Sequence, residues 1–345
     1  MFCSENVWVR WRMWAAACLG MTAIASHVCA EEKGSTEQTQ ASGGNWVIVH
    51  PAFVQGFRFD SATAFSAELS RVWGQAVPVH ASTRGKGVEA MRWSLSVAPQ
   101  QPSVLLLPEE SMLMGESRKP HPAHVSNYET LLVLGFKRWC MFVHPDSPVQ
   151  SAGQLRDWVG QQTAPIRIAL PLAAGRKHLW VQGMAQNTQH AWEVQSYRVN
   201  GDFAAALTQG RADLALARCD RIGTQSTELR VLVQSGDTRA AEMADVPTFE
   251  QAGLLPFEHG WSAFLVPKSV PVRERAAMAQ ALHRAASSLR IQQGLKAAGF
   301  QPADLSPSAS RAYIERFVSG WELVEQFLMG EHVNDSWQRK ESAKR

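Results

Sequence analysis

The sequence predicts an α/β fold divided into two lobes. Short apolar runs rich in Val and Leu alternate with amphipathic helical stretches, which is the pattern of open parallel sheets covered by helices. The 345 residues are too many for one ordinary core and suit two lobes of roughly 100–200 residues each. Hydrophobic residues make up 45% and charged residues 19%, which excludes a disordered, collagen-like or multi-span membrane chain.

The first 30 residues have the pattern of a secretory signal. Arg10 and Arg12 precede an apolar run over 13–25, and residues 28–30 (VCA) place a small residue before the cut. The apolar run is shorter than the ~20 residues that a spanning helix needs. We therefore expect cleavage near Ala30 and an exported, periplasmic protein; an uncleaved anchor is the alternative. A polar, flexible leader is expected over 31–45.

Ten apolar runs are the candidate strands. Most do not alternate with polar residues, so burial on both faces is expected. They are Trp46–His50, Ala76–His80, Ser103–Leu107, Leu131–Gly135, Trp139–Val143, Ile166–Leu170, Trp192–Tyr197, Asp213–Ala217, Arg230–Gln234 and Ser262–Val266.

Helices are expected between these strands because apolar residues recur at helical spacing next to capping residues. The first carries Phe65 and Leu69, with Asp60 or Ser61 as N-cap and Gly74 as its stop. The other expected helices begin at capping residues or turns, and the final helix is followed by a polar tail. Their marker residues are Ser151 before Leu155; Asn200 before Phe203 and Leu207; Pro271 before Met278 and Leu282; and Tyr313, Phe317 and Trp321 in the final helix.

Two cysteines, Cys140 and Cys219, remain in the mature chain. An exported chain meets oxidising conditions, so a disulfide is allowed. Each residue also lies in or at the end of an apolar run, so two buried thiols are an equal alternative.

The residues give no sign of catalysis. The nucleophile elbow G-x-S-x-G, the P-loop, H-E-x-x-H and C-x-x-C are all missing from the sequence. His121 and His124 lie in a Pro-rich segment, where a solvated loop is a better interpretation than a metal site. Lys plus Arg number 34 against 31 Asp plus Glu, a net charge of +3 that argues against nucleic-acid binding. We expect no enzyme activity, metal or cofactor.

Two strand-to-helix loops are the candidate binding segments. They span 50–60 (HPAFVQGFRFD) and 171–178 (PLAAGRKH), and each contains a glycine and at least one basic residue. In open α/β sheets, ligands bind at the carboxyl ends of strands, where helix N-termini present free N–H groups. Small anions are the expected ligands, and two ordinary surface connections are the alternative.

Residues 245–253 (DVPTFEQAG) and 260–267 (GWSAFLVP) resemble a stretch typical of the Bug family of periplasmic receptors for tripartite tricarboxylate transporters. Weaker similarities precede them, at 207–214 (LTQGRADL), at Tyr197-Arg198 and at 74–77 (GQAV). Together they cover roughly 46–328. Glu250 stands one place earlier than the family's acidic residue.

The resemblance implies a type II-like periplasmic-binding-protein fold with two crossovers and a central cleft. The run Leu131–Val143 and the strand ending at Pro267 would hold the crossovers. Lobe 1 would comprise 46–136 plus 260–328, lobe 2 would comprise 137–259, and 329–345 would form a polar tail. The implied protein is a monomer that captures a small organic anion, di- or tricarboxylate above all, for the membrane subunits of a transporter.

The two loops would supply the ligand site. The candidate ligand-binding residues are Pro51, Gly56, Arg58, Gly175, Arg176, His178, Tyr197 and Arg198. The family's first loop reads roughly P-x-x-P-G-G-G-T-D, whereas Gln55 and Phe57 flank Gly56 here. Ala217 replaces an Asp that can meet a ligand's ammonium group in some members, so an amino acid is the less expected ligand.

These departures suggest a clamp made of side chains. Arg58, Arg176 and Arg198, if all face the cleft, would balance a ligand with two or more negative charges. Alternatively, Arg176 and Lys177 point to solvent from the first helical turn. A signalling or orphan receptor of the same fold, and less so a secreted enzyme using the cleft, are the competing functions.

Overall fold

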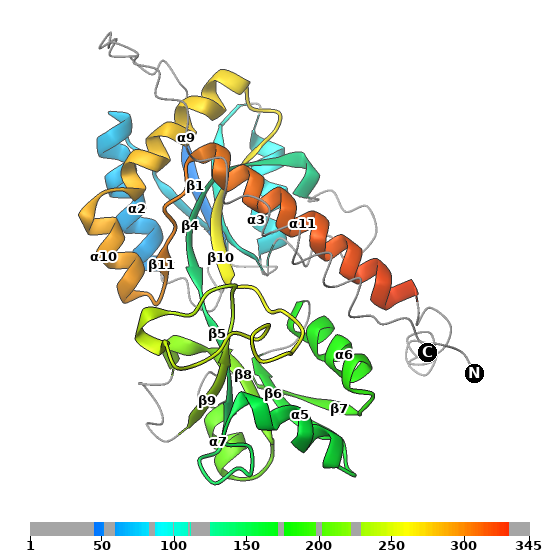
Figure 1. The fold of residues 1–345 in the computed structure, drawn as a ribbon. Helices are drawn as coiled ribbons and strands as arrows, with labels where there is room; N and C mark the ends of the chain where they lie inside the picture. The colour runs from blue at the N-terminus through cyan, green and yellow to red at the C-terminus, as the bar shows by residue number, and fades with distance from the viewer. Residues whose placement is uncertain are drawn as a thin grey trace, which may run out of the picture. The chain divides into compact units, whose positions relative to one another are not determined.

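The computed structural model describes residues 45–51, 59–82, 87–98, 100–109, 111, 125–171, 176–197, 202–221 and 229–330. The predicted signal, the predicted leader up to residue 44 and the predicted tail from residue 331 lie outside these residues, as do His121, His124 and Asn200. Residues 329–330, which the sequence assigned to the polar tail, belong to the last helix. The described chain forms two sheets with helices packed against them, which confirms the predicted two-lobed α/β class (Figure 1). No helix in the described ranges combines the length and the apolar character needed to cross a membrane.

The larger sheet has six strands and lies in the first lobe. Four helices of this lobe are α2 (Phe59–Trp73), α3 (Val88–Val97), α9 (Val272–Ala286) and α10 (Leu289–Ala297), and the long α11 (Pro307–Gly330) follows them. From edge to edge its strands are β11 (Gln301–Pro302), β4 (Tyr128–Lys137), β10 (Gly260–Pro267), β3 (Ser103–Pro108), β1 (Val47–Pro51) and β2 (Val79–Ser82).

The smaller sheet has five strands and lies in the second lobe. Its helices are α5 (Ala152–Gln161), α6 (Arg176–Thr188) and α7 (Asp202–Thr208). From edge to edge its strands are β7 (Trp192–Tyr197), β6 (Ile166–Pro171), β8 (Leu214–Arg218), β5 (Trp139–Val143) and β9 (Arg230–Gln234).

Both sheets are mixed, so the expectation of parallel sheets was wrong in part. β10 runs antiparallel to β3 and β4, and β5 runs antiparallel to β8 and β9. The remaining described pairs are parallel, except that β11 runs antiparallel to β4. Unalternating apolar runs report burial on both faces of a strand and not its direction.

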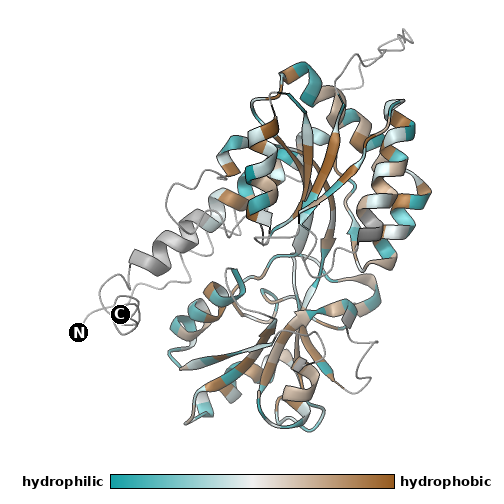
Figure 2. Ribbon diagram, turned by 180° about the vertical axis from the view of Figure 1, so that it is seen from behind, coloured by the Kyte–Doolittle hydropathy of each residue, from teal (hydrophilic) through white to brown (hydrophobic). Residues whose placement is uncertain are grey.

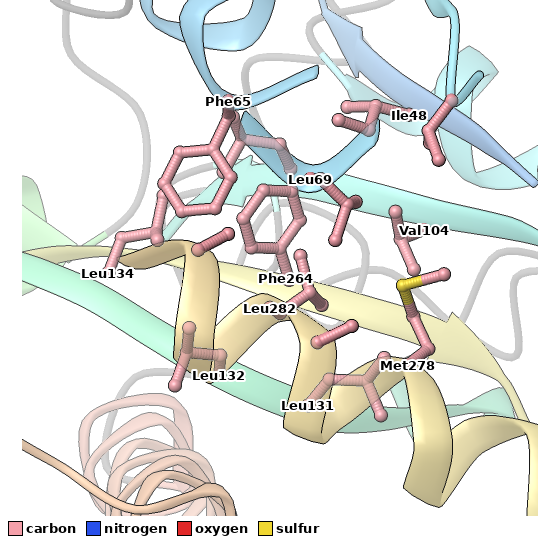
Figure 3. Close-up of a cluster of buried hydrophobic side chains, with 14 of the residues drawn as sticks. Ile48, Phe65, Leu69, Val104, Leu131, Leu132, Leu134, Phe264, Met278 and Leu282 are labelled. Carbon is pink, nitrogen blue, oxygen red and sulfur yellow. The ribbon is translucent and has the colours of Figure 1, made fainter. Parts of the chain in front are cut away.

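The faces of the six-stranded sheet carry separate cores. In β1, Ile48 packs into a cluster with α2 and α9, whereas Val49 packs into a cluster with α3 and α11. Figure 3 shows the first cluster, in which Phe65 and Leu69 of α2 lie near Phe264 of β10. The apolar strands run inside both lobes, while the helices contain both hydrophilic and hydrophobic residues (Figure 2).

The chain changes sheet at Arg138, the single residue between β4 and β5, inside the run predicted to hold the first crossover. It returns through 235–259, after β9. The strand ending at Pro267, which was expected to hold the second crossover, belongs wholly to the six-stranded sheet. Figure 1 shows β4 continuing into β5.

The predicted helix ends were confirmed only in part. α2 already begins at Phe59, so Asp60 and Ser61 lie inside the helix and are not its N-cap. Gly74 follows α2 with a φ of 80°, the left-handed conformation in which helices commonly end. Ser151 is the N-cap of α5, although its side chain makes no capping hydrogen bond.

Cys140 and Cys219 form a disulfide with an S–S distance of 2.03 Å. Cys140 lies in β5 and Cys219 directly follows β8, the antiparallel neighbour of β5. Of the two alternatives that the sequence left open, the structure has the bridge.

Candidate functional site

The carboxyl ends of β1 and β6 lead into the two predicted binding loops. Pro51 is the last residue of β1, and α6 begins at Arg176, soon after β6 ends. Four of the candidate residues, Gly56, Arg58, Gly175 and Arg198, lie outside the described residues. The other four, Pro51, Arg176, His178 and Tyr197, are described.

Arg176 is buried, with 3% of its side chain exposed, and it forms an ion pair with Glu109. Its Nη2 donates to Oε1 of Glu109 at 2.5 Å, and its Nη1 donates to the carbonyl oxygen of Glu258 at 2.9 Å. The backbone N–H of Trp261 donates to the other oxygen of Glu109, Oε2, at 3.1 Å. Because one oxygen of this carboxylate pairs with the guanidinium, Glu109 balances the charge of Arg176 internally.

Aromatic rings enclose the Arg176 guanidinium. Its central carbon lies 4.5 Å from the ring centroid of Phe257, 5.7 Å from that of Phe317 and 5.8 Å from that of Trp321. The negative faces of such rings attract a cation, and their bulk keeps water away from the ion pair. Phe317 and Trp321 belong to α11 of the first lobe, so Arg176 reaches across from the second.

Lys177 is also buried, so the solvent-facing alternative for these two basic residues was wrong. The Lys177 Nζ lies 4.2 Å from the ring centroid of Trp139. Basic residues in the first turn of a helix oppose its dipole. Here the carboxylate of Glu109 and the face of Trp139 offset that cost.

His178 and Tyr197 lie in the second lobe near the same end of the sheet. His178 is half-buried in the first turn of α6, and burial lowers its pKa, which favours the neutral imidazole. Tyr197 ends β7 in register with Pro171, the last residue of β6. A neutral imidazole and a phenol can each donate one hydrogen bond to an anion.

The returning segment adds two titratable residues beside Arg176. Burial raises the pKa of Glu258, while the positive charge of Arg176 opposes that rise. Burial above all, together with the charges of Arg138 and Arg176, lowers the pKa of His259 to about 3. Nδ1 of His259 lies 2.9 Å from the hydroxyl of Ser235, which already accepts a hydrogen bond from the backbone N–H of Trp139. This arrangement suits a neutral ring that accepts the Ser235 proton.

Sequence reasoning missed Glu109, Phe257, Glu258 and His259. Glu109 directly follows β3, at the carboxyl end of a buried strand. The same rule that selected the two loops would have selected this strand end as well. Among the described residues, no group of three or more His, Cys, Asp or Glu could hold a metal ion.

The described chain has the two-lobed α/β fold of periplasmic solute-binding proteins. It is similar to a TctC solute-binding protein from Polaromonas, with a TM-score of 0.70, 14% identity, and coverage of 81% of this chain and 97% of that one. It also resembles MatC from Rhodopseudomonas palustris with bound malate, at a TM-score of 0.61 and 17% identity over 81% of this chain and 98% of that chain. It is also similar to the periplasmic binding protein BugD, at a TM-score of 0.60 and 19% identity over 82% of this chain and 97% of that chain.

A further similar structure is an R. palustris protein with adipate, at a TM-score of 0.62 and 19% identity, covering 84% of this chain and 98% of that chain. No family model matches the sequence, and no curated protein matches it. The likeness therefore lies in the fold, where it confirms what the motifs at 245–253 and 260–267 predicted.

Proposed function

We propose that this protein is a periplasmic receptor that captures a small organic anion between its two lobes and delivers it to membrane subunits of a transporter. The observation that carries the proposal is the fold, since nearly the whole length of several solute-binding proteins superposes on this chain. Two of those proteins hold malate and adipate, both dicarboxylates. The Cys140–Cys219 bridge suits an oxidising compartment and so supports export.

The charges of the site favour a dicarboxylate. Because Glu109 already balances Arg176, that guanidinium adds little net charge to the site. Arg58 and Arg198 then remain as the proposed clamp, and two cations match two carboxylates. Gly56 and Gly175 would allow close approach of the backbone, and the first turn of α6 would offer N–H groups to the anion. Pro51, His178 and Tyr197 would line the same site.

A thermal-unfolding screen followed by Trp fluorescence tests the proposal. Purified mature protein is heated with mono-, di- and tricarboxylates and with amino acids. A ligand at about 100 times its dissociation constant stabilises the folded state by roughly 2.7 kcal/mol, a shift of several degrees. We expect the largest shift with a dicarboxylate, weakened by salt. No shift with any compound would overturn the proposal.

A matched pair of variants then tests the clamp. Arg58→Gln removes a proposed ligand contact, whereas Arg273→Gln removes an exposed arginine in the first turn of α9. Losing a charge-assisted hydrogen bond worth about 1.5–3 kcal/mol weakens binding by roughly 10- to 100-fold. We expect that loss in the Arg58 variant only; equal affinities would refute the clamp. Recovery of the bound compound unchanged would support binding without catalysis.

A further inference from the structure

The Glu109–Arg176 ion pair connects the two lobes. Glu109 directly follows β3 of the six-stranded sheet, and Arg176 begins the helix that follows β6 of the five-stranded sheet. Both side chains are 3% exposed. α6 also contacts α11 of the first lobe. Because each partner is anchored in a different lobe, the lobes can separate only if this pair breaks.

The bonding of Glu109 is that of a bound carboxylate. One oxygen accepts from the Arg176 guanidinium and the other accepts from the backbone N–H of Trp261, in β10. A guanidinium together with a backbone N–H is a donor set that proteins use for free carboxylate ligands. We propose that Glu109 serves as an internal carboxylate that holds the two lobes together when no solute is bound. This inference shares Arg176 with the proposed function but requires no solute.

The surroundings of the pair explain why its strength depends on contact between the lobes. Phe257, Phe317 and Trp321 surround the guanidinium, so attraction between the charges acts through a medium less polar than water. Once the lobes part, water reaches both charges and the attraction falls steeply. The pair therefore stabilises the joined arrangement and adds little to the separated one.

Gly260 fits the same arrangement. A Cβ at this position would lie 2.9 Å from Nε1 of Trp139 and 3.5 Å from Oε2 of Glu109. Glycine thus lets the start of β10, the first strand of the second lobe and the Glu109 carboxylate meet at one point. The close approach places Glu109 where residues from both lobes converge.

Chemical replacement of the missing carboxylate provides the test. Glu109→Ala removes the carboxylate that accepts from Arg176 and from the Trp261 N–H, and added acetate or formate can supply another. Small-angle X-ray scattering measures the radius of gyration, and thermal unfolding measures stability. We expect the variant to have a larger radius of gyration than wild type and to melt at a temperature lower by roughly 10 °C. Acetate should reverse both changes, whereas neutral acetamide should not.

Asp213→Ala is the matched control. Asp213 pairs with Arg167 at 2.6 Å, but both residues belong to the second lobe and their side chains are 25% and 39% exposed. This variant also loses a carboxylate from an arginine pair, so it tests whether any broken pair expands the protein. We expect its radius of gyration to equal that of wild type; an expansion equal to that of the Glu109 variant would overturn the inference.

Glu109→Gln serves if Glu109→Ala does not fold. Glutamine keeps an oxygen for the Trp261 N–H but places an amide NH2, which cannot accept, toward Arg176, so it removes the charge and one acceptor. We therefore expect expansion in the same direction. An unchanged radius of gyration, or equal effects of acetate and acetamide, would refute the internal carboxylate. The result is independent of the receptor proposal. Acetate rescue of Glu109→Ala can occur even if wild type binds nothing in the solute screen, and a solute shift in wild type can occur without rescue.

Discussion

Protonation of His259 should make the protein less stable in mild acid. The folded state holds this half-buried ring neutral, with a pKa of about 3, whereas a histidine in the unfolded chain takes up its proton near pH 6.5. Unfolding therefore binds a proton at any pH between these values. Stability is fully present above pH 6.5 and is lost as the pH falls toward the folded pKa.

The size of the loss follows from the pKa difference. One proton taken up on unfolding lowers the free energy of unfolding by about 1.4 kcal/mol for each pH unit. Between pH 6.5 and about 4.5 the contribution of His259 is thus at most about 3 kcal/mol. The ring keeps some contact with solvent, so this is an upper limit.

Urea unfolding of wild type and His259→Gln across this pH range measures the effect. Glutamine can keep a hydrogen bond to Ser235 but cannot titrate, so we expect a flatter dependence of stability on pH. The raised pKa of Glu258 has the opposite sign, because the folded state then takes up a proton before the unfolded state does. Glu258→Gln should therefore steepen the loss of stability in acid. Identical pH dependence of wild type and His259→Gln would refute the reasoning.

Two further predictions concern stability alone. Replacing Cys140 and Cys219 by alanine removes a bridge between residues 79 apart in the sequence. The chain-entropy model predicts that the free energy of unfolding falls by about 4.5 kcal/mol, and disulfides typically contribute about 2–4 kcal/mol. A change in urea midpoint no larger than the scatter would contradict this. Gly236→Ala should lower the melting temperature more than Gly74→Ala. Both glycines have positive φ, but only at Gly236 would a Cβ overlap the His259 ring. Equal melting temperatures of the two glycine variants would show that the close approach does not matter.

Strand positions could be predicted because burial leaves a local signature. Trp139–Val143, Trp192–Tyr197 and Arg230–Gln234 coincide with β5, β7 and β9. Each is a short run rich in apolar or β-branched residues, and neighbouring turns mark its ends. Strand direction has no such signature, since it depends on the path of the chain between the sheets. The antiparallel placement of β10 follows from the return of the chain at 235–259.

The site could be predicted only at the level of its loops. The strand-end rule led to Arg176, but its partner Glu109 lies 67 residues away and is placed by another strand. The apolar neighbours of Cys140 and Cys219 likewise fit either a thiol or a bridge. The fold decides between them, because β8 pairs with β5 and Cys219 directly follows β8. Charge balance in a site is a property of the assembled fold, so an arginine in a loop does not by itself indicate a positive site.

This balance changes what an incoming anion would meet. An unpaired Arg176 would attract any carboxylate over a distance set by the ionic strength, about 10 Å at 0.1 M. Paired with Glu109 and enclosed by rings, it attracts little at long range, although a ligand could still displace Glu109 at contact. Displacing Glu109 loses the favourable free energy of its pair with Arg176. Binding is therefore favourable overall only for an anion that makes additional contacts. The Glu109–Arg176 pair would then select against small monocarboxylates. The proposed clamp at Arg58 and Arg198 would add to this selection by favouring an anion with two carboxylates.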